Sequence, residues 1–230
     1  MKKSLFLAVA SLALAAVADA FSPSIGVRQF TSSVDNFILP VMFDSLSAVS
    51  ISAKELVATN GLDVGTALYV YQDNTYTSWL LTANGWVATA KAAEGVPATA
   101  PDENQTLTAG HAIWITPVKG KTFSIYGKVA SSISVMVVAG TKTSPKNYLL
   151  ANPTGSAIAL STALTDMTPK KGDTIRIIGD TDTYTYNETA KKWYKISPGA
   201  SPAEATLPSL AAFTGFWYMS KGGSGTIALH

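Results

Sequence analysis

The 230-residue chain contains no cysteine. This absence excludes disulfide bonds, thiolate catalysis and cysteine-ligated metal sites. Histidine is almost absent too, because His111 is the one internal histidine and His230 is the last residue. Zinc sites need several histidine, cysteine or carboxylate ligands close together, so we expect no metal site and no cofactor. Stability must then come from the burial of apolar side chains.

The chain also lacks a long hydrophobic run. Its one extended apolar stretch, Leu5–Val17, is shorter than the roughly 20 residues of a membrane-spanning helix. Two lysines precede this stretch, and the small-x-small sequence Ala18-Asp19-Ala20 follows it. The pattern predicts a secretory signal peptide over residues 1–20, with no transmembrane segment after its removal. We expect a periplasmic, cell-surface or extracellular location.

Charge is sparse. Charged residues make up 14% of the chain, against roughly 25% in a typical soluble domain. Without residues 1–20 the chain has 15 basic and 14 acidic side chains, a net charge of +1. We therefore expect no nucleic acid partner, since such partners select strongly basic surfaces. A weakly charged surface opposes association poorly, which favours a homo-oligomer or contact with another envelope protein.

Motifs for nucleophilic catalysis and phosphate binding are missing. No G-x-S-x-G elbow and no glycine-rich loop followed by Lys-Ser/Thr occurs. The segment "GDTDTYTYNE" contains four carboxylate or amide side chains without the spacing of a calcium loop. These four are Asp180, Asp182, Asn187 and Glu188. Asp and Asn commonly form turns, so we interpret the segment as a polar hairpin edge rather than a calcium site.

What the chain does contain is one pattern that occurs twice. The run "NFIL" at 36–39 corresponds to "NYLL" at 147–150, and "GTALYVY" corresponds to "GDTIRII". The corresponding aromatic residues are Trp86 with Trp193, 107 positions apart, Trp114 with Trp217, 103 positions apart, and Trp79 with Tyr186. Self-similarity at a fixed spacing is typical of repeat architectures. It predicts two tandem duplicated domains, residues 21–130 and 131–230.

Within each predicted domain the periodicity is that of β-structure. We expect strands in the first domain over 25–30, 36–42, 66–72, 75–82, 85–89, 111–116 and 122–126. Asn84-Gly85 predicts a two-residue hairpin turn. Short helices are expected over 52–61, where Ser52 and Glu55 form a capping box, and over 161–167. The fold class is therefore all-β, with two small β-sandwich or barrel domains and at most one short helix in each.

The second domain carries a more specific pattern. The segments "NYLLANP", "KKGDTIRI", "TYTY" and "GFWYMSKGG" follow one another within 146–223. In this order they resemble a family of uncharacterised secreted bacterial β-repeat proteins, in which an N-P segment precedes G-D-x-I, T-Y-T-Y and G-F-W-Y strands. The first domain departs from the pattern, with "ILPVM" and "HAIWI" at the matching places. The resemblance implies a secreted, modular, non-catalytic protein and transfers no activity, ligand or catalytic residue.

The recurring tryptophans have two interpretations. Exposed on a β surface, Trp86, Trp114, Trp193 and Trp217 would stack on sugar rings, and neighbouring Asn, Asp and Thr would bond the hydroxyl groups. This makes them candidate ligand-binding residues for a glycan. Buried, the same rings would be core residues, because each aromatic side chain buries roughly 150–250 Å².

A paired-aspartate hydrolase is the alternative from a different class. Asp73 and Asp180 each follow an apolar strand at matching places in the two domains. Two such carboxylates meeting in a cleft could share a proton, as in aspartic proteases. The sequence thus predicts a secreted, non-catalytic structural or binding module, with this hydrolase and a self-assembling surface scaffold as alternatives.

Overall fold

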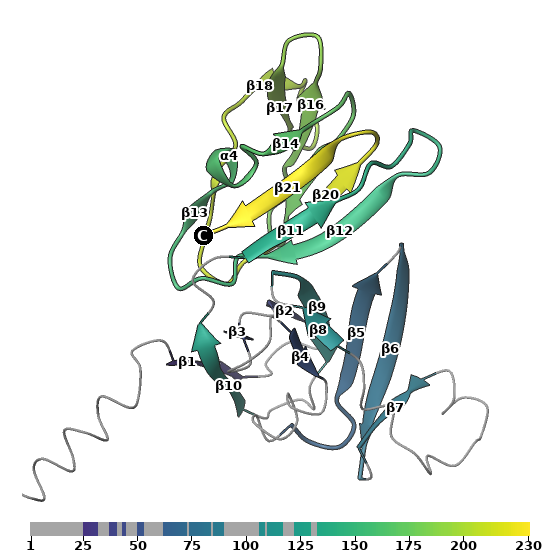
Figure 1. Ribbon diagram of the computed structural model, residues 1–230, viewed down its shortest axis with the longest axis vertical. Coiled ribbons are helices and arrows are strands. Elements are labelled where there is room, and N and C mark those ends of the chain that lie inside the picture. Colours follow the sequence, from purple (N-terminus) through teal and green to yellow (C-terminus); the bar gives the residue numbers. More distant parts are fainter. Residues whose placement is uncertain are drawn as a thin grey trace, which may run out of the picture.

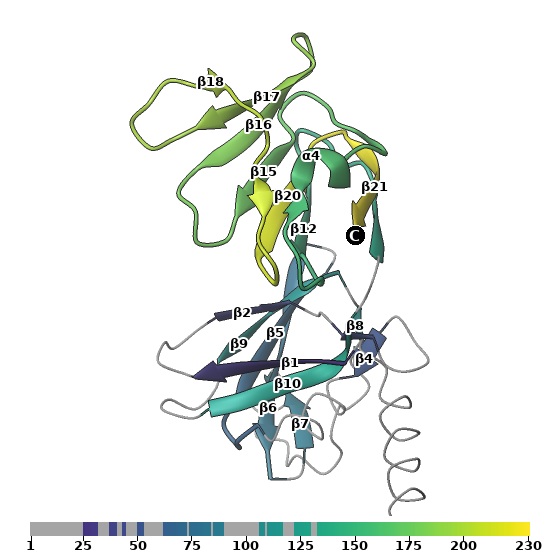
Figure 2. The ribbon, with the colours of Figure 1, turned by 90° about the vertical axis from the view of Figure 1, so that its left-hand side faces the viewer.

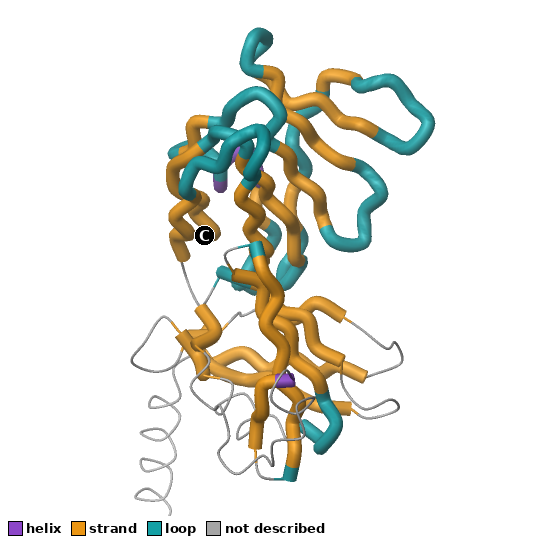
Figure 3. Tube along the Cα trace, turned by 90° about the vertical axis from the view of Figure 1, so that its right-hand side faces the viewer, coloured by secondary structure: helices purple, strands orange, loops and turns teal. Residues whose placement is uncertain are grey.

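The structure of the protein is a computed structural model. It describes residues 25–31, 37–40, 43–44, 50–52, 62–72, 74–83, 85–89, 106–108, 110–116, 122–129 and 133–230. These residues form two halves that follow one another along the long axis of the molecule, the second half above the first in Figure 1. Strands dominate both halves, and the short helix α4 (Leu160–Ala163) lies in the second (Figure 3).

The first half contains ten strands with defined bounds. They are β1 (Ile25–Thr31), β2 (Phe37–Pro40), β3 (Phe43–Asp44), β4 (Ser50–Ser52), β5 (Ala67–Gln72), β6 (Thr75–Thr82), β7 (Gly85–Ala88), β8 (Thr106–Thr108), β9 (Ala112–Thr116) and β10 (Thr122–Val129). The seven strands predicted from the sequence are all present, with ends within a few residues of the expected ones. The prediction of an all-β chain is confirmed.

The second half contains α4 and the remaining eleven strands. They are β11 (Ile133–Val137), β12 (Lys146–Ala151), β13 (Ile158–Ala159), β14 (Met167–Thr168), β15 (Thr174–Ile177), β16 (Thr183–Asn187), β17 (Lys192–Ile196), β18 (Ala203–Glu204), β19 (Ser209–Leu210), β20 (Gly215–Ser220) and β21 (Ser224–Leu229). Figure 2 shows β16, β17 and β18 extending to the side of this half.

The sheets of the two halves have similar strand orders, although the largest sheet of the second half has an additional outer strand, β18. The first half has sheets β2-β9-β5-β6-β7, β1-β10-β3 and β4-β8, and the second has β12-β20-β15-β16-β17-β18, β11-β21-β14 and β13-β19. The third strand of the three-stranded sheet differs, because β3 pairs with the end of β10 whereas β14 pairs with the start of β21. No sheet formed by these strands closes on itself, so the arrangement is open rather than a barrel.

The register places two tryptophans of the first half like two tryptophans of the second. Trp114 lies opposite Ile38 and Tyr69, and Trp217 lies opposite Leu149 and Arg176. On the next hairpin Trp86 pairs with Leu81, and Trp193 pairs with Tyr186. The position equivalent to Tyr186 is therefore Leu81, and the predicted correspondence with Trp79 was wrong. The cause is hairpin length, since twelve residues lie between the paired Ala67 and Leu80 whereas ten lie between the paired Thr174 and Thr185.

The core of the second half lies between its six-stranded and three-stranded sheets. Every second residue of β11 points inward, so that Ile133, Val135 and Val137 are buried and the residues between them are exposed. These side chains meet Phe216 and Tyr218 of β20, neither of which is exposed to solvent. Leu160 and Ala163 of α4 cover one end of the core. Two sheets over one core make this half an open sandwich.

The predicted turn at Asn84-Gly85 needs correction, and most of the helix predicted over 52–61 lies outside the described residues. Strand β6 ends at Thr82, which pairs with Gly85, so Gly85 belongs to the strand ladder rather than to the predicted Asn84-Gly85 turn, and Asn84 lies outside the described residues. Gly85 is the first residue of β7. Ser52, the expected helix cap, ends strand β4, and the rest of the helix expected over 52–61 lies outside the described residues. The weaker helix signal at 161–167 corresponds to α4 and the turn that follows it.

Candidate functional site

The two halves meet through a small apolar cluster. Its buried residues are Ala112 of β9 and Leu149 and Ala151 of β12. Four half-buried side chains surround them: Tyr71, Trp114, Ile178 and Trp217. The rings of Tyr71 and Trp217 contact edge to face, with centroids 4.8 Å apart and planes at 86°. Aromatic side chains of both halves therefore contribute to one interface.

Asn74 fixes the tip of the β5–β6 hairpin against the edge of β12. Its Nδ2 donates to the carbonyl of Pro145 at 2.6 Å, and its Oδ1 accepts from the backbone N–H of Asn147 at 2.9 Å. The side-chain amide thus pairs with the outer edge of β12 as a neighbouring strand would. Asn74 has φ of 63°, a left-handed conformation that asparagine tolerates better than most residues.

Further along β12, backbone groups of the first half take over from the Asn74 side chain in pairing with the outer edge of the strand. His111 forms an isolated antiparallel bridge with Leu150, and the N–H of Ala151 donates to the carbonyl of Gly110 at 2.9 Å. Gly110 has φ of +85°, and a Cβ there would approach Cγ2 of Ile133 to 2.7 Å. Only glycine fits this turn. The outer edge of β12 is therefore covered by the first half at both ends.

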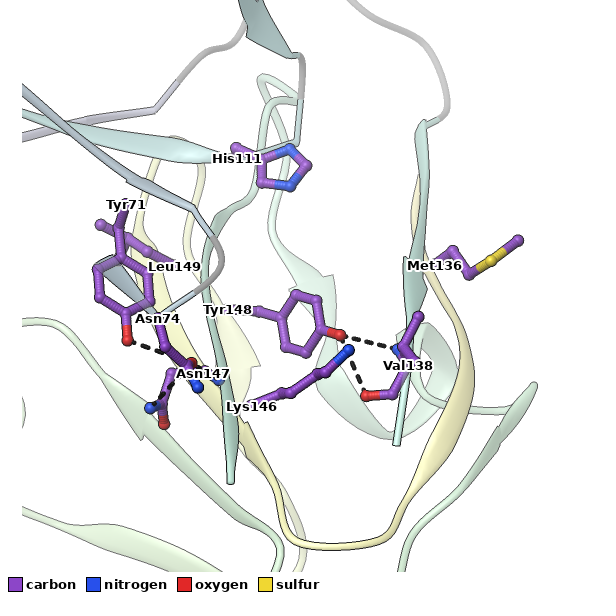
Figure 4. A pocket seen from close by; sticks show the side chains of 9 residues that line it. All are labelled: Tyr71, Asn74, His111, Met136, Val138, Lys146, Asn147, Tyr148 and Leu149. Carbon is purple, nitrogen blue, oxygen red and sulfur yellow. Dashed lines mark hydrogen bonds between the residues drawn. The ribbon is translucent and has the colours of Figure 1, made fainter. Parts of the chain in front are cut away.

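A cavity of about 370 Å³ lies between these contacts, which we name the inter-half pocket. Its lining comes from both halves and comprises Tyr71, Asn74, His111, Met136, Val138, Lys146, Asn147, Tyr148 and Leu149. Figure 4 shows Tyr148 near its centre, between the His111 ring and Val138. Small-molecule sites have volumes of roughly 300–1,000 Å³, so the inter-half pocket has the size of a small binding site.

Tyr148 connects the edges of the two sheets of the second half. Its hydroxyl accepts from the N–H of Val138 at 2.8 Å and donates to the carbonyl of the same residue at 3.1 Å (Figure 4). Tyr148 belongs to β12, and Val138 directly follows β11. One side chain thus spans the open side of the sandwich, and the inter-half pocket lies beside it.

The chemistry of the inter-half pocket is polar and weakly basic. One lysine, the exposed Lys146, lines the pocket. The other polar lining residues are two asparagines, two tyrosines and a histidine. The nine lining residues include no carboxylate. General acid–base catalysis by paired carboxylates would need two such groups. The arrangement can bind a polar or acidic ligand through hydrogen bonds and one positive charge.

The four tryptophans predicted to bind a ligand lie in three different places. Trp86 is 1% exposed and belongs to the core of the first half, so no face of its ring is open to a ligand. Trp114 and Trp217 lie together in the cluster between the halves. Trp193 packs on the core of the second half and contacts Tyr186 edge to face, at a centroid distance of 5.2 Å.

Asp180, one of the two aspartates of the predicted hydrolase, takes part in its own turn. Its Oδ1 accepts from the N–H of Asp182 at 3.0 Å. Asp73 lies outside the described residues, so the pairing of the two carboxylates stays a prediction. Asp182 and Glu188 form ion pairs with Lys195 and Lys170. Across the described ranges, no three His, Cys, Asp or Glu side chains gather closely enough to hold a metal ion.

A fully buried carboxylate, Asp173, ties the β20–β21 turn to the turn before β15. It accepts from the Tyr218 hydroxyl at 2.9 Å and from the backbone N–H groups of Lys170 at 3.0 Å and Lys221 at 2.7 Å. Burial raises the pKa of the Tyr218 hydroxyl, and the adjacent Asp173 carboxylate raises it further. Every partner of this carboxylate is a turn or the core, so its role is structural.

Asn152 and Ser220 hold other loops in the same way. The buried Asn152 amide donates to the carbonyls of Ser156 and Leu210, at 2.7 and 3.2 Å, and its Oδ1 accepts from the N–H of Thr154 at 2.9 Å. The Ser220 hydroxyl donates to the carbonyl of Gly223 at 2.6 Å. The residues that carry the family-like pattern, "NP", "GD" and "SKGG", are therefore fold-forming ones.

Sequence reasoning missed the inter-half pocket. Tyr71 and His111 stood out only as members of a hairpin and of a strand, and Lys146 did not stand out. No local pattern could have identified the group, because Tyr71 and Asn74 meet residues 136–149 only when the halves pack.

Comparisons with protein-family models, with curated proteins and with solved structures find no match for the chain. Within the described part of the chain, no helix has both the length and the apolar character needed to cross a bilayer.

Proposed function

We propose that the protein is a secreted, non-catalytic binding or structural module of the bacterial envelope or extracellular space, and that it binds its ligand in the inter-half pocket. The observation that carries the proposal is the composition of this pocket, whose walls come from both halves. Asn74 and the His111–Leu150 bridge hold these walls in a fixed arrangement. A preformed site loses little conformational entropy when it binds a ligand. Secretion is supported by the signal-peptide pattern of residues 1–20.

We also infer that the two halves derive from a tandem duplication. The similar strand orders support this inference, as does the pairing of Trp86 and Trp193 with equivalent residues. The turns that open β5 and β15 agree in detail. The N–H of Gly65 donates to Leu81 at 2.9 Å, and that of Gly172 donates to Tyr186 at 3.2 Å. The two halves differ in one respect, because the tip of the β5–β6 hairpin of the first half covers the outer edge of β12 of the second.

A glycan is one candidate ligand. Tyr71 and Tyr148 place aromatic rings in the inter-half pocket, and Asn74 and Asn147 add amides that bond hydroxyl groups. The half-buried Trp217 lies directly behind Tyr71. The site would therefore hold a sugar by tyrosines and asparagines rather than on a tryptophan platform.

The other predicted functions have weaker support. The paired-aspartate hydrolase needs Asp73 and Asp180 together, and the contacts of Asp180 are those of a turn. Asn74, next to Asp73 in the chain, contacts Pro145 and Asn147 rather than the turn that holds Asp180. A self-assembling surface scaffold stays a prediction, and sedimentation velocity over a range of protein concentrations would test it.

Saturation-transfer NMR tests the proposal. The probes are cellotriose, maltotriose, N-acetylglucosamine trimer and an extended acidic peptide. Val138→Trp introduces a bulky ring into the inter-half pocket, whereas Val64→Trp, at a similarly exposed position of the first half, is the matched control. We expect a probe that binds the wild type and Val64→Trp to bind Val138→Trp at least about tenfold more weakly, because the ring occupies the cavity. Unchanged binding to Val138→Trp would show that the pocket is not the site.

A further inference from the structure

Strand β11 is an outer strand beside the inter-half pocket. Its described strand partner is β21, and it is the first strand of the sheet β11-β21-β14. Met136 in the middle of this strand is 75% exposed, and Val138 just beyond it is 49% exposed. Both residues line the pocket. The pocket therefore borders the side of β11 that faces away from β21.

The backbone groups on this side can be identified from one contact. The N–H and C=O of Val138 both point toward the Tyr148 hydroxyl, away from β21. Along a strand, the backbone groups of successive residues point to alternate sides. Those of Met136 and Ser134 are then directed to the same side as those of Val138, while Val135 and Val137 face β21. Two residues of β11 thus present an N–H and a C=O each to the pocket side.

This edge lacks the usual protection against strand pairing. The segment Ile133–Val138 reads "ISVMVV" and contains neither a charged residue nor a proline. Natural edge strands commonly carry lysine, proline or a bulge, because an unprotected edge pairs with other chains. A free edge next to a cavity is also how extended peptides are recognised. Main-chain hydrogen bonds then supply affinity, and the cavity selects a side chain.

The charge of the site indicates which side chain fits. Lys146 lines the pocket, and no carboxylate among the described residues forms an ion pair with it. Three other lysines of this half, Lys170, Lys192 and Lys195, each pair with an acidic residue. Because the lining includes no carboxylate, the Lys146 ammonium group is available to pair with an acidic group of a ligand.

We infer that the inter-half pocket binds an extended peptide segment, which adds to β11 as a new outer strand and directs an acidic side chain toward Lys146. The segment would cover Ser134–Val138, about five residues or roughly 17 Å. It would also close the open side of the sandwich between β11 and β12. This inference rests on the proposed function, since it names the ligand class of the same site.

A fluorescein-labelled peptide tests the inference by anisotropy. The probe is T-V-T-V-E-V-T-V-T, compared with the same peptide carrying glutamine at its centre and with one N-methylated on alternate residues. We expect the full-length protein to bind the glutamate peptide about tenfold or more tightly than the glutamine peptide, because a charge-assisted contact is lost. Lys146→Gln should abolish that preference. N-methylation should prevent binding, because it removes the N–H donors of the added strand.

Proline substitutions test the edge itself. Met136→Pro removes an N–H that faces the pocket and leaves the ladder to β21 complete, so the protein should stay folded by circular dichroism and lose peptide binding. Val137→Pro removes a ladder donor and should instead lower the unfolding midpoint strongly. Met136→Thr keeps the N–H and should keep peptide binding, which separates the backbone from the side chain.

The outcomes separate this inference from the proposed function. If a trisaccharide probe binds and the glutamate peptide does not, the peptide inference is wrong and the binding module stands. If folded Met136→Pro binds the peptide as the wild type does, strand addition is wrong. If the protein itself forms dimers that Met136→Pro abolishes, the edge serves a second copy rather than a peptide. If neither peptide nor sugar binds, both proposals fail.

Discussion

The two halves have similar strand orders and differ in the polar groups that hold them. In the first half, the hydroxyl of the fully buried Thr66 donates to the backbone carbonyl of Asp63, three residues earlier in the same turn, at 2.7 Å. In the second half the equivalent residue is Asp173, and its carboxylate reaches the β20–β21 turn, about fifty positions later in the chain. Both residues follow a glycine of positive φ, Gly65 or Gly172. The glycine thus fixes the turn, and the side chain of the next residue determines whether the turn is hydrogen-bonded within itself or to a distant turn as well.

The largest expected difference between the halves concerns their equivalent tryptophans. Trp86→Ala should cost about 3–5 kcal/mol of unfolding free energy, because the ring is fully buried. Trp193→Ala should cost roughly half as much, since Trp193 is half-buried and loses mainly its contact with Tyr186. Urea unfolding followed by far-UV circular dichroism measures both. Equal losses would mean that the two positions are equivalent in packing as well as in register.

The turn residues should give a smaller but sharper contrast. Asp173→Ala should cost about 3 kcal/mol or more, because it leaves the Tyr218 hydroxyl and two backbone N–H groups without their charged acceptor. Thr66→Ala removes one neutral hydrogen bond and should cost about 1 kcal/mol. The same urea titrations provide the values. A Thr66→Ala loss as large as that of Asp173→Ala would contradict the distinction between local and long-range ties.

The smallest effect expected is the pH dependence that Tyr218 contributes to the stability of the second half. The pKa of Tyr218 is raised in the folded protein, so this tyrosine keeps its proton where an unfolded tyrosine, of pKa about 10, loses it. Its contribution to stability is complete below pH about 10 and declines as the pH rises further. Unfolding midpoints measured between pH 8 and pH 11 should fall less steeply for Tyr218→Phe than for the wild type. Identical slopes would show that Tyr218 is not the group responsible.

Local sequence patterns were sufficient for seven of the ten described strands of the first half, and they missed β3, β4 and β8, which are two or three residues long. Glycine-started runs of β-branched and aromatic residues such as that of β5 predict strands, because every second side chain of such a run can be buried on one face. Trp86 and Trp193, which the spacing matched, each pair with the preceding strand of their hairpin, at Leu81 and Tyr186. Trp79 and Tyr186 were matched wrongly, because a hairpin can gain a residue in each arm without changing its neighbours.

The inter-half pocket could not be predicted in this way. Asn74 contacts Pro145 and Asn147, more than seventy residues away, and neither partner has a distinctive local pattern. The tryptophans drew attention because they recur, yet Trp86 recurs as a core residue. A repeat indicates which positions are equivalent, and burial decides what each of them does.

The coverage of the β12 edge by the first half has a consequence for folding during synthesis. Gly110 and Asn74 are synthesised before Lys146–Ala151, the strand edge that they cover. Synthesis adds roughly 5–20 residues per second, and N-terminal parts generally fold first. The cover can therefore be in place several seconds before the edge emerges. Reversing the order of the halves would leave that edge unprotected while its cover was still being translated.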